Sequence, residues 1–287
     1  MTPLCAPPCP MDDDHAALTA VALHGGGLCT VTRIDGSWSR RLGAQLAVLP
    51  DGTTAGSLAD GCLERALAEE VRAGGPARVL RYGEGSPFVD IRLPCGSGIE
   101  VRIDPAPDAP ALAAACATLA RREAAELAIG TDQPRRYLPS LRLILLGSGP
   151  ELATLARLAA AQGIAVMVGT PKGEPGDIAL SLGQSPILPA DWAPDAWTAI
   201  AVLFHDHEWE RTLIPWALGT GAFYVGAQGG AKARANRLVH LGELGLGDAA
   251  AARLHSPIGL IPAARTPSVL ALSVLAEVVA AYEALLG

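Results

Sequence analysis

The feature that most constrains the fold is the apolar segment LRLILLG at residues 141–147, which runs directly into a glycine turn. An almost uninterrupted apolar strand is typical of a parallel sheet that is buried on both faces. Gly147 and Gly149 belong to the turn, the helix-like run ELATLARLAAAQG follows, and a second apolar strand covers 164–169. This order of strand, glycine turn, helix and strand predicts a β-α-β unit.

The same alternation continues to the C-terminus. Apolar strands at 198–204 and 222–227 are each followed by helix-like sequence, and a final amphipathic helix runs from Pro267 to about Leu286. Proline is favourable at a first helical position. We therefore expect residues 141–287 to form a Rossmann-like domain with a mainly parallel sheet.

The first half of the chain predicts a smaller α/β domain over residues 12–105, preceded by a flexible Pro-rich tail at 1–11. Its expected elements are a helix from the Asp12–Asp14 run to Leu23, strands at 28–34, 45–49, 77–82 and 99–103, and a helix from Leu63 to about Arg72. An Ala-rich helix at 111–129 is expected to lie in a helical linker at 106–140. Two domains of ordinary size suit a chain of 287 residues.

Charge and hydropathy limit the partners and the compartment. The net charge of −7 and the pI near 5.4 argue against nucleic acid or an anionic membrane as the main partner. No apolar run reaches the ~20 residues needed to cross a bilayer, and no secretory signal is evident, so we expect a cytoplasmic protein with reduced cysteines. The apolar content of 50% is high for a two-domain monomer, so we also expect a homodimer.

The first glycine turn keeps only part of a dinucleotide-binding fingerprint. Gly147 and Gly149 match G-x-G-x-x-G, but Leu152 replaces the third glycine. The second strand ends in Gly169-Thr170, without the acidic residue that bonds the ribose of NAD. We expect that NAD does not bind, although the helix N-terminus after Gly149 can receive a phosphate. An NAD(P)-dependent oxidoreductase is the alternative from another functional class.

Two histidines follow the strand at 198–204, where ligands bind in this architecture. His205 and His207 lack a third ligand at a helical or hairpin spacing, so we expect no metal site. Instead, we interpret this segment as a hydrogen-bonded loop that contacts a ligand through His205.

A second glycine turn, with Gly226 and Gly229, follows the strand at 222–227. Lys232, Arg234 and Arg237 come next, on a predicted helix. These charges could complete a second phosphate site, or they could form a solvated basic face.

The first domain carries arginines in a glycine-bounded loop. Arg40 and Arg41 lie between Gly36 and Gly43. Arginine suits bidentate contact with phosphate or carboxylate, and glycine lets a backbone approach a ligand closely. This combination predicts an anion-binding loop.

Two cysteines of the same domain lie in glycine-rich surroundings. Cys62 follows Gly61 at an expected helix start, which lowers the pKa of a thiol, and Cys95 lies in the loop Pro-Cys-Gly-Ser-Gly. A thiolate can act as a nucleophile, carry a persulfide sulfur or bind a soft metal. A sulfur or metal carrier that uses these cysteines alone is therefore a further alternative.

Taken in order, these segments resemble the XdhC/CoxI family, accessory proteins that mature molybdenum-cofactor hydroxylases such as xanthine dehydrogenase. The resemblance covers nearly all of residues 15–287. The elements that carry it are Gly36-Ser37, Arg40, Gly43-Ala44, Asp51-Gly52, Gly56-Ser57, Gly61-Cys62-Leu63-Glu64, Cys95-Gly96-Ser97-Gly98, Gly147 to Pro150, His205-Asp206-His207, Gly226-Ala227, Pro257-Ile258-Gly259-Leu260 and Thr266-Pro267.

The resemblance implies an accessory chaperone and not a turnover enzyme. Such a protein binds molybdenum cofactor as cargo (molybdopterin or a dinucleotide form), assists its sulfuration and delivers it to an apo molybdenum hydroxylase. A separate cysteine desulfurase would supply the sulfur, and Cys62 and Cys95 would handle sulfur and molybdenum. The residues implied for cofactor binding are Ser37, Arg40, Arg41, Gly43, Gly61, Glu64, Gly96, Gly98, Gly147, Gly149, His205, Gly226 and Gly229.

The chain departs from the family pattern at several positions. Ser39 stands where the family usually has proline, and Asp60 replaces the first glycine before the cysteine. Gly169 replaces the usual acidic residue after the second strand. The segment Gln228-Gly229-Gly230-Ala231-Lys232 stands where the family commonly has Gly-Ser-Arg-Arg after the Gly-Ala turn. The last two changes argue against nucleotide binding by the second domain, and they point to a different cofactor form, such as a cytosine dinucleotide variant, or to a different client enzyme.

Overall fold

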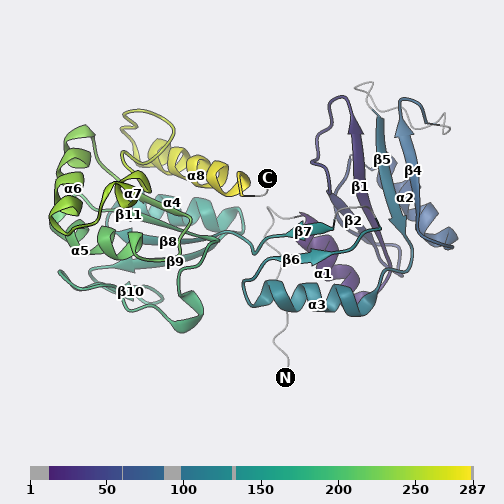
Figure 1. Cartoon of the computed structure of the whole chain (residues 1–287), viewed down its shortest axis with the longest axis horizontal. Coiled ribbons are helices and arrows are strands. Elements are labelled where there is room, and N and C mark those ends of the chain that lie inside the picture. Colours follow the sequence, from purple (N-terminus) through teal and green to yellow (C-terminus); the bar gives the residue numbers. More distant parts are fainter. Residues whose placement is uncertain (1–12, 60, 87–97, 131–133, 286–287) are drawn as a thin grey trace. The chain divides into compact units, whose positions relative to one another are not determined.

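The computed structural model describes residues 13–59, 61–86, 98–130 and 134–285. The chain divides into two compact units, Met1–Pro139 and Ser140–Gly287, each built on its own sheet (Figure 1). The elements of the first unit are α1 (Asp13–His24), β1 (Gly27–Asp35), β2 (Gln45–Val48), β3 (Thr54–Gly56), α2 (Cys62–Ala73), β4 (Arg78–Gly83), β5 (Gly98–Asp104), α3 (Ala109–Ala120), β6 (Ala125–Leu127) and β7 (Arg135–Tyr137).

The sheet of the first unit is antiparallel, with the strand order β3-β2-β1-β5-β4. Successive residues of a strand point to opposite faces. Leu46 and Val48 of β2 accordingly share a core with Leu63 of α2, whereas Ala47 shares a second core with Leu18 of α1. Helix α2 therefore covers one face of the sheet, and α1 and α3 cover the other.

The Ala-rich helix is shorter than its composition predicts. Helix α3 ends at Ala120, because Arg122 adopts a left-handed backbone conformation with φ of 61°. The chain then turns, and Ala125 to Leu127 pair with β7, which buries the side chains at both ends of this strand. The expectation of a helix through residue 129 is wrong, because burial in a hairpin outweighs the helix propensity of the segment.

Hydrogen bonds attach this hairpin to the first sheet. The Tyr137 hydroxyl donates to Gln45 Oε1 at 2.6 Å, and Gln45 Nε2 donates to Thr30 Oγ1 at 3.0 Å, all in buried surroundings. Leu112 of α3 and Leu127 of β6 belong to the same apolar core as α1. The segment expected as a linker thus contributes a helix and a hairpin to the first unit.

The second unit has a six-stranded parallel sheet with the order β10-β9-β8-β11-β12-β13. Its elements are β8 (Arg142–Gly147), α4 (Pro150–Ala161), β9 (Ala165–Thr170), β10 (Ile178–Ala179), a 3-10 turn (Ala190–Trp192), β11 (Thr198–Leu203), α5 (His207–Leu218), β12 (Tyr224–Ala227), α6 (Ala231–Glu243), α7 (Asp248–Ala252), β13 (Leu254–His255) and α8 (Pro267–Glu283). Counted from β8, the order is 3-2-1-4-5-6, the doubly wound arrangement of dinucleotide-binding domains. The two central strands, β8 and β11, are buried along their whole length, as the apolar segments predict.

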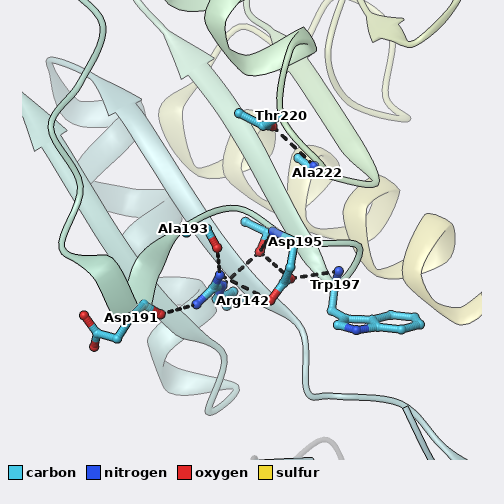
Figure 2. Close-up of polar contacts among 8 residues, drawn as sticks. Arg142, Asp191, Ala193, Asp195, Trp197, Thr220 and Ala222 are labelled. Carbon is cyan, nitrogen blue, oxygen red and sulfur yellow. Dashed lines mark hydrogen bonds and ion pairs between the residues drawn. The ribbon is translucent and has the colours of Figure 1, made fainter. Parts of the chain in front are cut away.

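One buried arginine secures the amino edge of this sheet (Figure 2). Arg142 opens β8 and donates to Thr198 Oγ1 at 2.8 Å, to the Asp191 carbonyl at 2.7 Å and to the Ala193 carbonyl. Its guanidinium also lies 3.3 Å from Asp195 Oδ2. These bonds hold the long connection before β11 against the sheet, on the edge opposite to that where ligands bind in such folds.

The C-terminal helix α8 packs against α4 and buries Ala271, Val274 and Val278. The Thr266 hydroxyl accepts a hydrogen bond from the N–H of Val269 and caps the helix start. The helix ends at Glu283, and the expected end at Leu286 lies outside the described residues. Within the described part of the chain, no helix has the length and apolar character needed to cross a membrane.

Candidate functional site

Three connections of the first unit begin or end at one edge of its sheet. The last residue of β1, Asp35, lies opposite Gly98, the first residue of β5, and Gly98 also lies opposite Gly83, the last residue of β4. On the neighbouring side, β2 begins at Gln45 and β3 ends at Gly56. The β1–β2, β3–α2 and β4–β5 connections therefore all begin or end at this edge, here called the loop edge.

The loop edge carries most of the residues expected to bind a ligand in the first domain. The described ones are Ser37, Arg40, Arg41, Gly43, Gly61, Glu64 and Gly98. Cys62 is the first residue of α2, which follows one of these connections, but its side chain lies outside the described residues. Cys95 and Gly96 also lie outside them.

Arg40 joins two of these connections. Its Nε donates to the Ser57 carbonyl at 3.2 Å, and its Nη2 donates to Ser57 Oγ at 3.0 Å. The Ser57 hydroxyl in turn donates to the Ala59 carbonyl at 3.3 Å. A guanidinium has five N–H donors, so an arginine bonded in this way to Ser57 keeps the capacity to bind an anion at the loop edge.

Glu64 organises the turn that precedes α2. Its carboxylate accepts hydrogen bonds from the N–H groups of Leu58 at 3.1 Å, Ala59 at 2.5 Å and Gly61 at 2.7 Å. The last bond is the return half of a capping box at the helix start. The family pattern implies that Glu64 binds the cofactor. In the structure its carboxylate instead binds three backbone N–H groups and so fixes the turn before Cys62.

Two of the expected glycines make room for arginine side chains of the protein itself. The Gly43 carbonyl accepts a hydrogen bond from Arg135 Nε at 2.9 Å, and a Cβ on Gly43 would lie 2.9 Å from the same atom. A Cβ on Gly98 would overlap the guanidinium of Arg81. Close packing inside the first unit thus explains both glycines.

Trp38 is a residue of the loop edge that sequence reasoning missed. Its ring packs against the apolar core beneath α2, and its indole N–H is buried with no hydrogen-bond partner among the described residues. A buried unpaired donor costs about 1–3 kcal/mol. An acceptor atom of a ligand would therefore be stabilised by a hydrogen bond from Trp38. The sequence signal for this residue was an aromatic side chain directly after the Gly-Ser turn.

Acidic groups balance the arginines at this edge. Asp35 accepts hydrogen bonds from Arg81 Nη1 at 2.7 Å and from Arg33 Nε at 3.0 Å. The bond from Arg81, followed by the bond from Arg33, holds the pKa of Asp35 below its usual value. The loop edge is therefore an ion-paired surface in which Arg33 and Arg81 are already engaged.

In the second unit, strand packing accounts for two of the expected glycines. Gly147 is the last residue of β8, and a Cβ there would overlap the carbonyl oxygen of Leu203 in β11. A Cβ on Gly226 in β12 would lie 2.5 Å from the Ile258 side chain. Both glycines let neighbouring segments approach at the carboxyl edge of the sheet.

A carboxylate occupies the start of α4, where a phosphate was expected. Gly149 precedes the helix with φ of 96°, and a Cβ on it would lie 3.4 Å from Glu151 Oε2. This oxygen is buried, has no hydrogen-bond partner in the part of the chain that the structure describes, and lies 3.7 Å from Nε2 of the exposed His205. Glu151 already supplies the negative charge that the helix N-terminus favours, so a phosphate there would be repelled.

A buried ion pair lies behind the histidine segment. Glu210 of α5 accepts hydrogen bonds from Arg237 Nε at 2.9 Å and Arg237 Nη2 at 2.6 Å, and its Oε2 lies 2.9 Å from His207 Nδ1. Arg237 also donates to Ser256 Oγ at 2.7 Å and to the Gln228 carbonyl. The pair thereby joins α5, α6, the glycine turn after β12 and the segment after β13.

Of the basic residues after the second glycine turn, Arg234 and Arg237 bind groups of the protein itself, whereas Lys232 is exposed. Arg237 is buried, and Arg234 donates to the carbonyls of Ser256 at 2.8 Å and Leu254 at 3.3 Å. Gly229 packs beside Arg237, because a Cβ on it would lie 3.1 Å from Nη2. Arg237 therefore belongs neither to a phosphate site nor to a solvated basic face, because it is buried and bonded to the carboxylate of Glu210.

A second carboxylate fixes the loop after β13. Glu277 of α8 accepts hydrogen bonds from the Tyr224 hydroxyl at 2.8 Å and from the Gly259 N–H, and its Oε1 lies 3.1 Å from His255 Nδ1. Burial acts to raise the pKa of Glu277, but the bonds with His255 and Tyr224, and then Gly259, hold it below its usual value. Burial and the bond to Glu277 raise the pKa of Tyr224.

The two histidines of the His-Asp-His segment have different partners. His205 approaches Glu151, whereas His207 binds Glu210, which lies three residues further along the same helix face. This i, i+3 spacing was the signal for Glu210 that sequence reasoning missed. Among the described residues, no group of three or more His, Cys, Asp or Glu side chains could hold a metal ion.

Comparison with known proteins agrees with this division of the chain. The profile described as "XdhC and CoxI family" matches residues 23–83, and the profile described as "XdhC Rossmann domain" matches residues 143–278. The chain is 32% identical to the molybdenum cofactor insertion chaperone PaoD of Escherichia coli (strain K12), over 93% of this chain and 89% of PaoD. The chain belongs to the XdhC/CoxI family. The resemblance seen in the sequence is thereby confirmed.

A second relative of this XdhC/CoxI protein is a probable xanthine dehydrogenase subunit of Bacillus subtilis (strain 168), which is 30% identical over 159 residues, or 50% of this chain and 44% of the relative. A crystal structure of a xanthine dehydrogenase from Bacillus halodurans superposes with a TM-score of 0.67 at 19% identity, over 90% of this chain and 92% of that one. This likeness concerns the fold alone. It confirms, together with the matched profile, the expected α/β class with a Rossmann-like second domain.

Proposed function

We propose that this XdhC/CoxI protein is a chaperone that binds molybdenum cofactor and delivers it to an apo molybdenum hydroxylase such as xanthine dehydrogenase. The observation that carries the proposal is the 32% identity to PaoD along 93% of the chain, since the name of PaoD describes insertion of molybdenum cofactor. A match of this length includes residues of both units, so the whole architecture is shared and not one motif.

The chemistry of the loop edge suits such a cargo. The pterin cofactor ends in a phosphate, for which the guanidinium groups of Arg40 and Arg41 are fitting partners. The buried indole N–H of Trp38 offers a donor for which the described residues provide no acceptor. We assign cofactor binding in the first unit to Ser37, Arg40 and Arg41, with Glu64 holding the adjacent turn.

We further propose that Cys62 and Cys95 handle sulfur during maturation of the cargo. The backbone supports this role for Cys62, because a thiol at the first position of a helix is more acidic and hence more nucleophilic at neutral pH. A cysteine desulfurase would donate a sulfane sulfur to one of these thiolates. Mass spectrometry after incubation with the desulfurase and cysteine should show a persulfide on Cys62 or Cys95, and unmodified cysteines would contradict the role.

The start of α4 in the second unit does not suit the diphosphate of a nicotinamide cofactor. A dinucleotide such as NAD places its diphosphate at the helix N-terminus after the glycine turn. The carboxylate of Glu151 lies at this position, beside Gly149. We therefore propose that the protein does not act as an NAD(P)-dependent oxidoreductase, and a fluorescence titration with NADH should show no binding.

We also propose that the protein acts as a homodimer. Support comes from exposed apolar side chains next to α8, namely Leu260 and Ile261 in the preceding loop and Leu272 on the helix itself. Light scattering after gel filtration should give twice the chain mass. Leu272→Glu should then give the mass of a monomer if this surface forms the interface.

The test of the main proposal is anaerobic retention of molybdenum cofactor by the purified protein, followed by transfer to an apo-hydroxylase. Wild type should carry cofactor through gel filtration and should activate the apo-enzyme. Arg40→Ala should lower retention by about tenfold or more, because a charge-assisted bond is worth about 1.5–3 kcal/mol. Cys62→Ala and Cys95→Ala should keep the fold and lower the fraction of sulfurated, active client.

Matched controls separate binding from folding. Arg121→Ala removes an exposed arginine at the end of α3, and Cys116→Ala removes a thiol of the same helix, away from the loop edge. Both should retain cofactor as wild type does. If folded wild type retains no cofactor, the proposal fails. If Arg40→Ala and Arg121→Ala retain it equally well, the site does not lie at the loop edge.

A further inference from the structure

A cavity of the second unit lies in the groove between α5 and α6, which lie side by side (Figure 1). Its lining extends from His207 to Pro215 on α5 and from Ala233 to Glu243 on α6. The cavity therefore runs along the two helices, whereas ligands of this fold class bind outside the carboxyl ends of the strands. Its volume of about 350 Å³ falls within the range of pockets that bind small molecules.

The floor of the cavity is apolar. Ile214 of α5 and Leu241 of α6 line it and are buried. Pro215 and Val239 also line the cavity, and Val239 is 63% exposed. An aliphatic group of a ligand would cover this surface and remove it from water, which is favourable in proportion to the apolar area buried.

A proline in α5 fixes the hydrogen bonding of one histidine of the cavity. In an α-helix the Arg211 carbonyl would accept a hydrogen bond from the N–H of residue 215, but Pro215 has no N–H. His240 Nε2 of α6 lies 3.0 Å from this carbonyl oxygen and donates to it instead. The proton of the neutral ring therefore lies on Nε2, and Nδ1 keeps its lone pair as an acceptor.

This Nδ1 atom faces a second acceptor. Glu243 Oε2 lies 3.5 Å from His240 Nδ1. A carboxylate has no hydrogen atom to donate, so neither of the two atoms supplies a proton for a bond between them. An N–H group of a ligand can therefore donate to both atoms.

A buried ion pair orients the second histidine of the cavity. His207 Nδ1 lies 2.9 Å from Glu210 Oε2 and donates to it, because the carboxylate can only accept. Arg237 holds the same carboxylate through two hydrogen bonds, and the side chains of Glu210 and Arg237 are only 3% and 5% exposed. The neutral ring of His207 thus presents Nε2 as a further acceptor.

The charges around the cavity favour a cation. Glu210 and Arg237 neutralise each other as an ion pair. Among the other described lining residues, the carboxylates of Glu208 and Glu243 outnumber the single guanidinium of Arg211, and all three residues are exposed. With two imidazole acceptors added, the cavity complements a positively charged group that carries several N–H donors.

We propose that this groove binds a guanidinium group on a short aliphatic stem. The stem packs on Ile214 and Leu241, and the N–H groups donate to His240 Nδ1 and the Glu243 carboxylate. A guanidinium suits these acceptors better than an ammonium, because its flat fork holds several N–H donors at fixed angles and is more weakly hydrated. It can belong to a free small guanidine or to an arginine side chain of a partner protein. The inference is independent of the cofactor site proposed at the loop edge.

The decisive experiment is NMR titration of the full chain, with carbon-13 in the methyl groups of isoleucine and valine. The ligands are n-butylguanidine and n-butylurea, which have the same shape but differ in charge. Butylguanidine should shift the methyl signals of Ile214 and Val239, whereas Val79, an exposed valine of the first unit, should not respond. Butylurea should bind about tenfold or more weakly, because the charge-assisted hydrogen bonds are lost.

Two variants test the assigned acceptors. Glu243→Gln should weaken butylguanidine about two- to fivefold, a modest loss because the Glu243 side chain is 63% exposed. His240→Phe keeps a flat ring without nitrogen atoms and should weaken it about tenfold. Glu69→Gln, at an exposed position of α2, is the matched control and should leave the affinity unchanged. Methyl spectra without ligand check the fold of each variant, and Glu243→Gln carries the test if His240→Phe does not fold.

A capped tripeptide of alanine, arginine and alanine distinguishes the two sources. Tighter binding of the peptide than of butylguanidine indicates an arginine of a partner protein, and the reverse order indicates a free small guanidine. The inference fails if millimolar butylguanidine leaves the Ile214 and Val239 signals in place. It also fails if butylurea binds equally well, or if Glu243→Gln and His240→Phe both bind butylguanidine as wild type does.

Discussion

The buried pair of Glu210 and Arg237 allows a quantitative test of what holds the carboxyl edge of the second unit. Glu210→Gln keeps the size of the side chain and removes its charge. The guanidinium of Arg237, with a side chain only 5% exposed, would then face an amide instead of a carboxylate. Its bonds to Ser256 and Gln228 remain, but they do not neutralise its charge.

The expected cost follows from this burial. Removing one partner of a buried ion pair destabilises a protein by about 3–5 kcal/mol, because the remaining charge stays desolvated. For a domain the size of the second unit, each kcal/mol lowers the midpoint of thermal unfolding by about 2–4 °C. Glu210→Gln should therefore lower this midpoint by roughly 6–20 °C.

Tryptophan fluorescence during heating is a suitable assay, because it reports mainly on the second unit. Four of the five tryptophans lie there, at positions 192, 197, 209 and 216. Glu208→Gln, on the same helix but exposed, is the matched control and should change the midpoint by no more than about 2 °C. Replacing Arg237 by Met together with Glu210→Gln should recover most of the loss. A midpoint for Glu210→Gln equal to that of the control would refute the argument.

Three further predictions concern other parts of the chain. Gly147→Ala should destabilise the second unit by about 1–3 kcal/mol in urea unfolding, since the added methyl would meet the Leu203 carbonyl, whereas Gly230→Ala has open space and should change it little. The lowered pKa of Asp35 means that its contribution to stability is present above pH ~4 and is lost as the pH falls through the folded-state pKa. The difference in unfolding free energy between wild type and Asp35→Asn should accordingly be positive at pH 7 and vanish in strong acid. Burial raises the pKa of Cys29 to about 12, so iodoacetamide at pH 8 should modify this thiol only after unfolding, and labelling of the native protein would contradict its burial.

Local sequence was sufficient for the elements whose packing follows from their own pattern. The uninterrupted apolar strands β8 and β11 and the glycine turn between β8 and α4 were readable, because full burial and a tight crossover demand these residue types. The end of α3 could not be predicted from the sequence, because Ala and Glu favour a longer helix, whereas the pairing of β6 with β7 ends it. The short strands β10 and β13 also escaped, since two residues carry no periodicity.

The same distinction applies to the candidate site. The residue types at Ser37, Arg40 and Gly61 and their order along the chain pointed to a ligand loop and to a family. The sequence could not show that Arg40 binds Ser57, because this contact depends on the pairing of β1, β2 and β3, which brings two connections together. The bonds from Leu58, Ala59 and Gly61 to Glu64 are local, but they depend on the conformation of the turn before α2, which the sequence alone did not give. Burial of Trp38 is a product of the same pairing.

By itself the sequence determined the fold class, the family and the segments that carry polar chemistry, since these depend on hydrophobic period and on motif order. Only the tertiary structure decided which charged side chains pair with each other inside the protein and which line a cavity. Arg237 became the buried partner of Glu210, whereas Glu243, unremarkable in the sequence, came to line the groove between α5 and α6. The physical reason is that the free energy of a charged group depends on its partners and its solvent exposure, and long-range packing sets both.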